Sequence, residues 1–329
     1  MAAARGRRAL LVLALLAVLI APAACVGAPA PGAGTASPSP SPNPAGPVPG
    51  AALPSAGPGD PLGPNGPTVA ADPVALARQI TDAEATVTDP ARSPAEVAAA
   101  GRVFQVAVEE LAFHPERLAP TLAALPPRWA DVTGRVVGAG RDLLSMAKGR
   151  PGDELPAWRV VDPQPPARLR AHYAEAQDRF GVPWTVLAAV NLVESRMGRI
   201  ASHSDAGAQG PMQFMPSTWA EYGLGGDVDD PRDAILGAAN YLRANGGTTD
   251  AGLDRALRRY NNDVRYVRAV RQYAAVMQAD ERAFLGFHAW VVYFRTTSGR
   301  VLLPTGYDEP EAILATDYLA RTAAPAPGR

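Results

Sequence analysis

The chain has 329 residues, of which 47% are hydrophobic, and a formal net charge of −1. This length leaves room for more than one domain of about 100–200 residues, and the near-neutral charge provides no basic field for nucleic acid. Cys25 is the single cysteine, which excludes a disulfide framework and a thiolate metal cluster. The histidines are scattered, so the sequence indicates neither a metal ion nor an organic cofactor.

Residues 1–25 have the composition of an export signal. Arginines precede a short apolar run from Leu10 to Ile20, and small residues follow it. The run is shorter than the roughly 18–20 residues of a membrane span, which favours a secretory signal peptide over an uncleaved anchor. Pro22-Ala23-Ala24-Cys25 resembles the lipobox of bacterial lipoproteins, with Pro22 where that family usually has Leu. The resemblance implies a lipid anchor at Cys25 and a place in the cell envelope; ordinary cleavage at an A-x-A site is the alternative.

Residues 26–71 form the next segment, rich in Pro, Ser, Gly and Ala. Fourteen of the 34 prolines lie between positions 26 and 73. Such a composition buries little apolar surface, and proline keeps the chain extended. We therefore expect a disordered tether between the membrane and the folded part.

A small helical domain of unknown role is expected over residues 72–148. Asp72-Pro73 has the pattern of an N-cap followed by proline at the first helical position. Ser93 to Glu96 forms a capping box, and a further helix is expected from Pro127 to Ala147. Residues 149–162 are rich in Pro and Gly and are expected to form a linker. A second helical block then extends to 279, and a C-terminal extension over 280–321 contains a predicted β-hairpin.

Glu194 lies on the apolar face of a helix that is predicted to begin at Val182-Pro183. Leu187, Val190 and Asn191 precede it by seven, four and three residues, which places them on one helix face. A carboxyl group on such a face is partly desolvated, which raises its pKa and keeps it protonated near neutrality. A protonated carboxyl is what a glycosidic leaving-group oxygen requires. Most helix glutamates are solvated, so the prediction depends on the residues that follow.

A loop-like segment follows, from Ala206 to Trp219. Gly207 and Gly210 permit turns and a close approach of the backbone to a ligand. Gln213 offers both a donor and an acceptor beside apolar Met212. The combination suits a sugar, which has apolar ring faces and hydroxyl or amide edges. A buried turn with core methionines is the alternative.

Residues 163–279 resemble the lytic transglycosylase domain (SLT type) of the lysozyme-like superfamily, and are most similar to the membrane-bound lytic murein transglycosylase B group. Four motifs in chain order carry the resemblance: NLVES (191–195), GAQGPMQFMPSTW (207–219), DP (230–231) with ANYL (239–242), and YN (260–261). The implied fold is mainly α, with a lysozyme-like catalytic domain preceded by the small helical domain and followed by the β-hairpin extension.

The resemblance also implies roles for individual residues. Glu194 matches the catalytic glutamate, and Gln213 matches the glutamine that contacts the N-acetyl sugar. Tyr260 matches a tyrosine near the glutamate, and Asn261 matches an asparagine that lines the cleft. The predicted substrate-binding residues are therefore Gly210, Met212, Gln213, Tyr260 and Asn261.

The implied reaction is a non-hydrolytic cut of peptidoglycan glycan strands. Glu194 would cleave the bond between N-acetylmuramic acid and N-acetylglucosamine and yield 1,6-anhydromuramyl products. A hydrolytic muramidase is one alternative, because Asp205 could supply the second carboxylate that activates water. A non-catalytic cell-wall-binding scaffold protein is the other.

Overall fold

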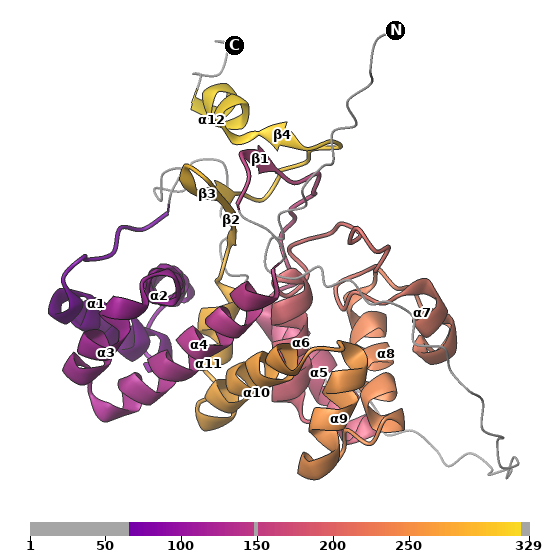
Figure 1. Cartoon of the computed structure of the whole chain (residues 1–329). Helices are drawn as coiled ribbons and strands as arrows, with labels where there is room; N and C mark the ends of the chain where they lie inside the picture. Colours follow the sequence, from indigo (N-terminus) through magenta and orange to yellow (C-terminus); the bar gives the residue numbers. More distant parts are fainter. Residues whose placement is uncertain (1–65, 148–150, 324–329) are drawn as a thin grey trace, which may run out of the picture.

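The computed structural model describes residues 66–147 and 151–323 (Figure 1). The expected signal peptide, Cys25 and nearly all of the expected tether lie outside these residues. The fold is mainly helical, as predicted, with a small strand hairpin near the C-terminal end. Among the described helices, none is both long and apolar enough to cross a membrane.

Four helices form the N-terminal part of the fold. Their bounds are α1 Pro73–Thr88, α2 Pro94–Phe113, α3 Pro115–Ala124 and α4 Pro127–Met146. Each begins with proline, whose fixed φ suits the first helical turn. The Asp72 carboxylate accepts a 2.8 Å hydrogen bond from the amide of Ala75, and Ser93 with Glu96 forms the expected capping box.

Seven helices follow in the central part of the chain. They are α5 Pro166–Phe180, α6 Trp184–Ser195, α7 Pro216–Tyr222, α8 Pro231–Ala244, α9 Asp250–Tyr260, α10 Val264–Ala279 and α11 Ala283–His288. Helix α6 packs against α5, α8, α10 and α11 and lies at the centre of the molecule (Figure 1). Eleven of its twelve residues are buried, and Glu194 is the half-buried exception.

The N-terminal helices share a continuous apolar core with this central part. Helix α4 packs against α10, and α2 packs against α11. The backbones of α2 and α11 approach so closely that a Cβ on Gly101 would lie 2.6 Å from the carbonyl oxygen of Gly286. Buried Gln105 extends the contact through two 2.9 Å hydrogen bonds with the backbone of Val291. The boundary between two domains stays a prediction.

A second, smaller core lies at one end of the molecule, beside the strands (Figure 1). Strands β2 Val292–Thr296 and β3 Gly299–Leu303 form the expected antiparallel hairpin. Strand β1 Glu154–Leu155, from the segment expected to be a linker, pairs with β4 Ile313–Leu314, and α12 Ala315–Ala323 follows. Two backbone hydrogen bonds, Val161 to Arg199 and Ala201 to Arg159, tie this segment to the loop that follows α6.

Candidate active site

Glu194 lies in the last turn of α6, where the chain leaves the helix abruptly. Arg196 and Met197 adopt left-handed backbone conformations, with φ of 55° and 59°, and Gly198 follows with φ of 88°. The helix ends at Ser195, before this left-handed run. The break brings the chain back across the end of α6 and leaves Glu194 only half-buried.

The carboxylate of Glu194 is held by a tyrosine on another helix. The phenolic hydroxyl of Tyr266, in the first turn of α10, donates a 2.6 Å hydrogen bond to Oε1 of Glu194. Burial raises the pKa of Glu194 to about 8, and the hydrogen bond from Tyr266 acts in the opposite direction. Glu194 is therefore mainly protonated at neutral pH, as its position on an apolar helix face predicted.

Tyr260 lies next to this pair but bonds elsewhere. Its ring is parallel to that of Tyr266, with a centroid separation of 6.4 Å and an interplanar angle of 6°. Burial first, and then the nearby charge of Glu194, raise the pKa of Tyr260. Its hydroxyl donates a 2.7 Å hydrogen bond to the carbonyl oxygen of Met212. Tyr260 thus connects the ring of Tyr266 to the glycine-rich loop.

Sequence reasoning did not identify Tyr266. It lies four residues before Val270 and seven before Tyr273, so it shares the buried face of α10 with them. A tyrosine on an apolar stripe needs a partner for its hydroxyl when it is buried. The sequence therefore indicated that a buried tyrosine at position 266 needs a hydrogen-bond partner, but it did not indicate that the partner is Glu194.

A buried polar network fixes the end of α6 against the loop. The side-chain amide of Asn191 donates a 2.8 Å hydrogen bond to the hydroxyl of Tyr173. The hydroxyl of Ser195 donates to the carbonyl of Pro211 at 2.6 Å and accepts from the amide of Gly198 at 2.9 Å. The residues on either side of the Glu194 turn are therefore anchored, which restricts the position of its side chain.

The loop itself is closed by a short two-way backbone bridge between Gln209 and Phe214, with two hydrogen bonds of 2.8 Å. Gly210, at the turn, has φ of +70°, and a Cβ there would lie 1.9 Å from the carbonyl oxygen of Val228. Only glycine combines this φ with so close a backbone contact. Gly210 therefore packs against the chain before α8. The sequence predicted a close approach of the Gly210 backbone to a ligand; in the structure the close contact is with the protein backbone at Val228.

Gln213 and Met212 differ in how they could meet a ligand. Gln213 has φ of +51°, and its Nε2 donates to the carbonyl oxygens of Gly210 at 2.9 Å and Ser202 at 3.3 Å. These bonds use the amide nitrogen and orient the side chain while leaving Oε1 for another partner. The Met212 side chain is fully buried, which favours core packing over direct contact with a sugar.

Asn261 and Asp205 occupy opposite environments. The side chain of Asn261 is 5% exposed, and its Oδ1 has no hydrogen-bond partner among the described residues. Asp205 is exposed in the loop after α6, and its carboxylate forms no hydrogen bond or ion pair within ranges 66–147 and 151–323. The described part of the chain contains no cluster of three or more His, Cys, Asp or Glu that could hold a metal ion.

The arrangement is that of a lysozyme-like domain. A central buried helix carries a half-buried glutamate at its C-terminal end, and a glycine-rich loop is anchored to that end. Residues 172–281 match the family described as the transglycosylase SLT domain. This segment is therefore an SLT domain of the lysozyme-like superfamily, which confirms the family indicated by the four motifs.

A further comparison extends beyond the SLT domain. The chain is 30% identical over 172 residues to a protein of Thiobacillus denitrificans named membrane-bound lytic murein transglycosylase F. The match covers 50% of this chain and 34% of that protein, so the chain spans about a third of the relative's length. The relative carries the name of type F, whereas the motifs suggested type B. No solved structure matches the chain.

Proposed function

We propose that this protein is a lytic transglycosylase that cleaves the bond between N-acetylmuramic acid and N-acetylglucosamine in peptidoglycan. The observation that carries the proposal is the environment of Glu194. Burial raises its pKa to about 8, so that it holds a proton at neutral pH, and Tyr266 orients its Oε1. A carboxylic acid in this state can act as a general acid.

The reaction requires one carboxyl group to act twice. Glu194 donates its proton to the glycosidic oxygen, and the bond from that oxygen to C1 of the muramyl sugar breaks. The carbonyl oxygen of the 2-acetamido group stabilises the positive charge at C1. The Glu194 carboxylate then removes the proton of the muramyl 6-hydroxyl, whose oxygen bonds to C1 and closes the 1,6-anhydro ring. No water is consumed, and Glu194 regains its proton.

The neighbouring residues support both halves of this cycle. The Tyr266 hydrogen bond stabilises the carboxylate that exists between the two proton transfers. Gln213, oriented through its Nε2, and the backbone at Gly210 would position the acetamido group. Tyr260 and Asn261 would shape the same region, and Met212 would contribute through its backbone, because its side chain is buried.

Analysis of released muropeptides tests the reaction. Wild-type protein should release products with 1,6-anhydro ends from purified peptidoglycan in water enriched in oxygen-18, and mass spectrometry should find no solvent oxygen in them. Glu194→Gln should release no products, whereas Asp205→Asn should remain active. Reducing ends that contain oxygen-18, lost in Asp205→Asn, would instead establish a hydrolytic muramidase. Wild-type protein that binds but does not cut would support a scaffold protein.

The location of the protein is a separate part of the proposal. The segment before the folded part would direct export and anchor the chain through a lipid on Cys25 to the outer face of the membrane. The name of the relative, a membrane-bound enzyme, supports a place in the cell envelope. Fractionation tests the anchor: Cys25→Ala should move the protein from the membrane fraction to the soluble fraction. A membrane-bound Cys25→Ala protein would contradict it.

A further inference from the structure

A cavity of about 70 Å³ lies between α2, α4, α10 and the β2–β3 hairpin. Arg196, which follows Glu194 by two residues, lines this cavity together with Tyr273 of α10 and Trp290. Glu194 and Gln213 do not line it, so the cavity is distinct from the candidate active site, although it adjoins the same turn. The N-terminal helices, the SLT domain and the C-terminal strands therefore meet around this cavity.

Positive charge exceeds negative charge on this wall. Arg196, Arg295 and Arg300 line the cavity. Arg300 lies 3.3 Å from Glu110 and 3.9 Å from Glu109. Arg196 and Arg295 each lie over an aromatic ring, and neither has a carboxylate within ion-pair distance in the part of the chain that the structure describes. Three guanidiniums against two carboxylates leave a surplus of +1.

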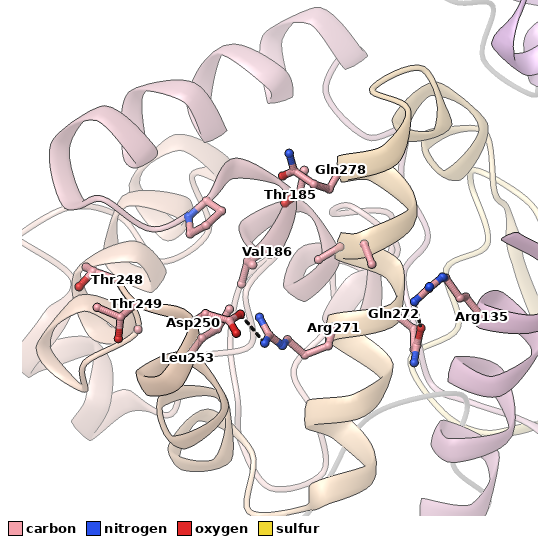
Figure 2. A pocket seen from close by; sticks show the side chains of 14 residues that line it. Arg135, Thr185, Val186, Thr248, Thr249, Asp250, Leu253, Arg271, Gln272 and Gln278 are labelled. Atoms are coloured by element: carbon pink, nitrogen blue, oxygen red, sulfur yellow. Dashed lines mark hydrogen bonds and ion pairs between the residues drawn. The ribbon is translucent and has the colours of Figure 1, made fainter. Parts of the chain in front are cut away.

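A larger cavity, at the other end of α6, has its charges paired (Figure 2). It measures about 490 Å³, and Arg135 and Arg271 line it. Arg135 pairs with Asp131 at 2.8 Å, and Arg271 pairs with Asp250 at 2.5 Å and with Asp254 at 3.1 Å. Among the described side chains, this wall therefore offers no unpaired cation, in contrast to the wall that contains Arg196.

A buried indole provides independent support for an occupant of the smaller cavity. Trp290 is 2% exposed, and its Nε1 has no hydrogen-bond partner among the described residues. Buried polar groups are nearly always paired, and an indole nitrogen can only donate, so the missing partner is an acceptor. The guanidinium carbon of Arg196 lies 5.3 Å from the centre of the Trp290 ring. A carboxylate at this place would accept from both side chains.

The size of the cavity fits a carboxylate on a short carbon stem. Benzene fills an apolar cavity of about 150 Å³, so about 70 Å³ holds a group of roughly half that size. An aspartate side chain, a carboxylate on one methylene carbon, is such a group. Val108, Ala112 and Leu144 supply apolar wall for the methylene.

The chain itself begins its described course at this cavity. Gly66, the first described residue, lies against Tyr293 of the cavity wall, where a Cβ on Gly66 would lie 1.9 Å from the tyrosine oxygen. Asp60 is the single charged residue between positions 26 and 65. It precedes Gly66 by six residues, which span about 19 Å in the extended geometry that Pro61 and Pro64 favour. The carboxylate of Asp60 can therefore reach the cavity.

We propose that the side chain of Asp60 docks into this cavity. Arg196 and Nε1 of Trp290 would donate hydrogen bonds to its carboxylate, and Arg295 would add positive charge. The single negative charge of Asp60 balances the surplus of +1 on the wall. Docking would hold the segment before the fold beside the turn that follows Glu194. The expected tether would then leave the folded part near the active-site end of α6.

The distance between two spin labels tests the docking in the full chain. In a Cys25→Ala background, one label is attached at Pro58→Cys and the other at Arg141→Cys, an exposed position on α4. Electron paramagnetic resonance should then give one narrow distance distribution. Asp60→Asn keeps the shape of the side chain and removes its charge, and it should widen the distribution at least twofold.

The variants of the wall complete the test. Arg196→Gln and Arg295→Gln should each widen the distribution as Asp60→Asn does, whereas Arg243→Gln, an exposed change on α8, should leave it narrow. Asp60→Asn alters no residue of the described fold, so its distribution decides the question even if an arginine variant fails to fold. The measurement requires no cleavage activity, so its result is independent of the proposed function.

Two results would overturn the proposal. An Asp60→Asn distribution as narrow as that of the unaltered segment would show that other contacts hold the segment. A distribution that is wide even with Asp60 in place would show that the segment does not dock. In the second case, calorimetric titration with acetate, bound by wild type and not by Arg196→Gln, would assign the cavity to an external carboxylate instead.

Discussion

Tyr266 donates a 2.6 Å hydrogen bond to Oε1 of Glu194, and the two residues are 72 positions apart in the chain. The bond joins the C-terminal end of α6 to the first turn of α10. It opposes the effect of burial, which raises the pKa of Glu194 to about 8. Tyr266 thus acts as a positioning residue that makes the carboxylate form accessible during the proposed cycle.

Replacement of Tyr266 by Phe should slow cleavage and change its pH dependence. A hydrogen bond to a charged group contributes about 1.5–3 kcal/mol, so kcat should fall about ten- to one-hundred-fold. Without the bond the pKa of Glu194 rises further, and the alkaline limb of the rate profile should move to higher pH. Tyr273→Phe, a buried tyrosine on the same helix, is the matched control and should leave the limb in place. A Tyr266→Phe profile with an unshifted limb would contradict the assigned role.

The wild-type protein should show an alkaline limb set by Glu194. The first step needs the protonated acid, and Glu194 is protonated below its pKa of about 8. The initial rate of peptidoglycan clearance should therefore stay high through neutral pH and fall as pH rises through about 8. Rates measured at constant ionic strength between pH 5 and 10 test this expectation. A fall that begins near pH 4.5, the value of an unburied glutamate, would show that Glu194 is solvated in solution.

The sequence predicted local features of this site better than its long-range contacts. The helical spacing of Leu187, Val190 and Asn191 correctly placed Glu194 on a buried face, because helix periodicity is a local property. The contact with Tyr266 depends on how α6 and α10 pack, and spacing within one helix contains no information about that. Tyr260 was the tyrosine that the motif indicated, but its hydroxyl bonds to Met212.

The same distinction applies to the fold. The capping box at Ser93 and the hairpin of β2 and β3 depend on residues close in sequence, and both were predicted. The pairing of β1 with β4 joins two-residue strands that are far apart in the sequence. Segments so short have no periodicity of their own, and the Pro- and Gly-rich composition around β1 instead indicated a linker.

Substitution of Gly210 by Ala should disrupt the glycine-rich loop that is anchored to the end of α6. The new Cβ would lie 1.9 Å from the carbonyl oxygen of Val228, and the φ of +70° adds strain. We expect a loss of about 3 kcal/mol or more in the free energy of unfolding, together with a loss of cleavage. Gly207→Ala is the matched control, because φ is +85° there but nothing lies within 4 Å of the added atom. It should cost about 1 kcal/mol. Equal losses in urea denaturation would show that the contact with Val228 does not form.

Substitution of Ser195 by Ala should loosen the loop without changing the carboxyl group of Glu194. The carbonyl of Pro211 and the amide of Gly198 would both lose a buried partner. Each unpaired group costs about 1–3 kcal/mol, so for the two groups we expect about 2–6 kcal/mol of destabilisation and a lower cleavage rate. Urea denaturation and clearance assays measure the two effects. Ser217→Ala, at an exposed position in α7, should change neither. A Ser195→Ala protein as stable as wild type would show that the hydrogen bonds of Ser195 do not stabilise the loop.

Glu84, in α1, should make stability depend on pH. Its side chain is 4% exposed; burial, and next the charge of Asp280, raise its pKa from 4.5 to about 8. The folded state therefore retains a proton that the unfolded chain releases above pH 4.5, so stability is lost as pH rises from about 4.5 to 8. Glu84→Gln cannot lose stability in this way. The urea midpoint of Glu84→Gln minus that of wild type should therefore increase from pH 5 to pH 9.

Glu96 provides a control for Glu84, because its pKa is lowered rather than raised. Its hydrogen bonds with Ser93 lower its pKa to about 2, so its ionised form favours the folded state above pH 4.5 and the contribution is lost as pH falls towards 2. Glu96→Gln should therefore be less stable than wild type at pH 7, with a difference that shrinks in acid. A Glu84→Gln midpoint that tracks wild type at every pH would show that Glu84 is hydrated in the folded protein.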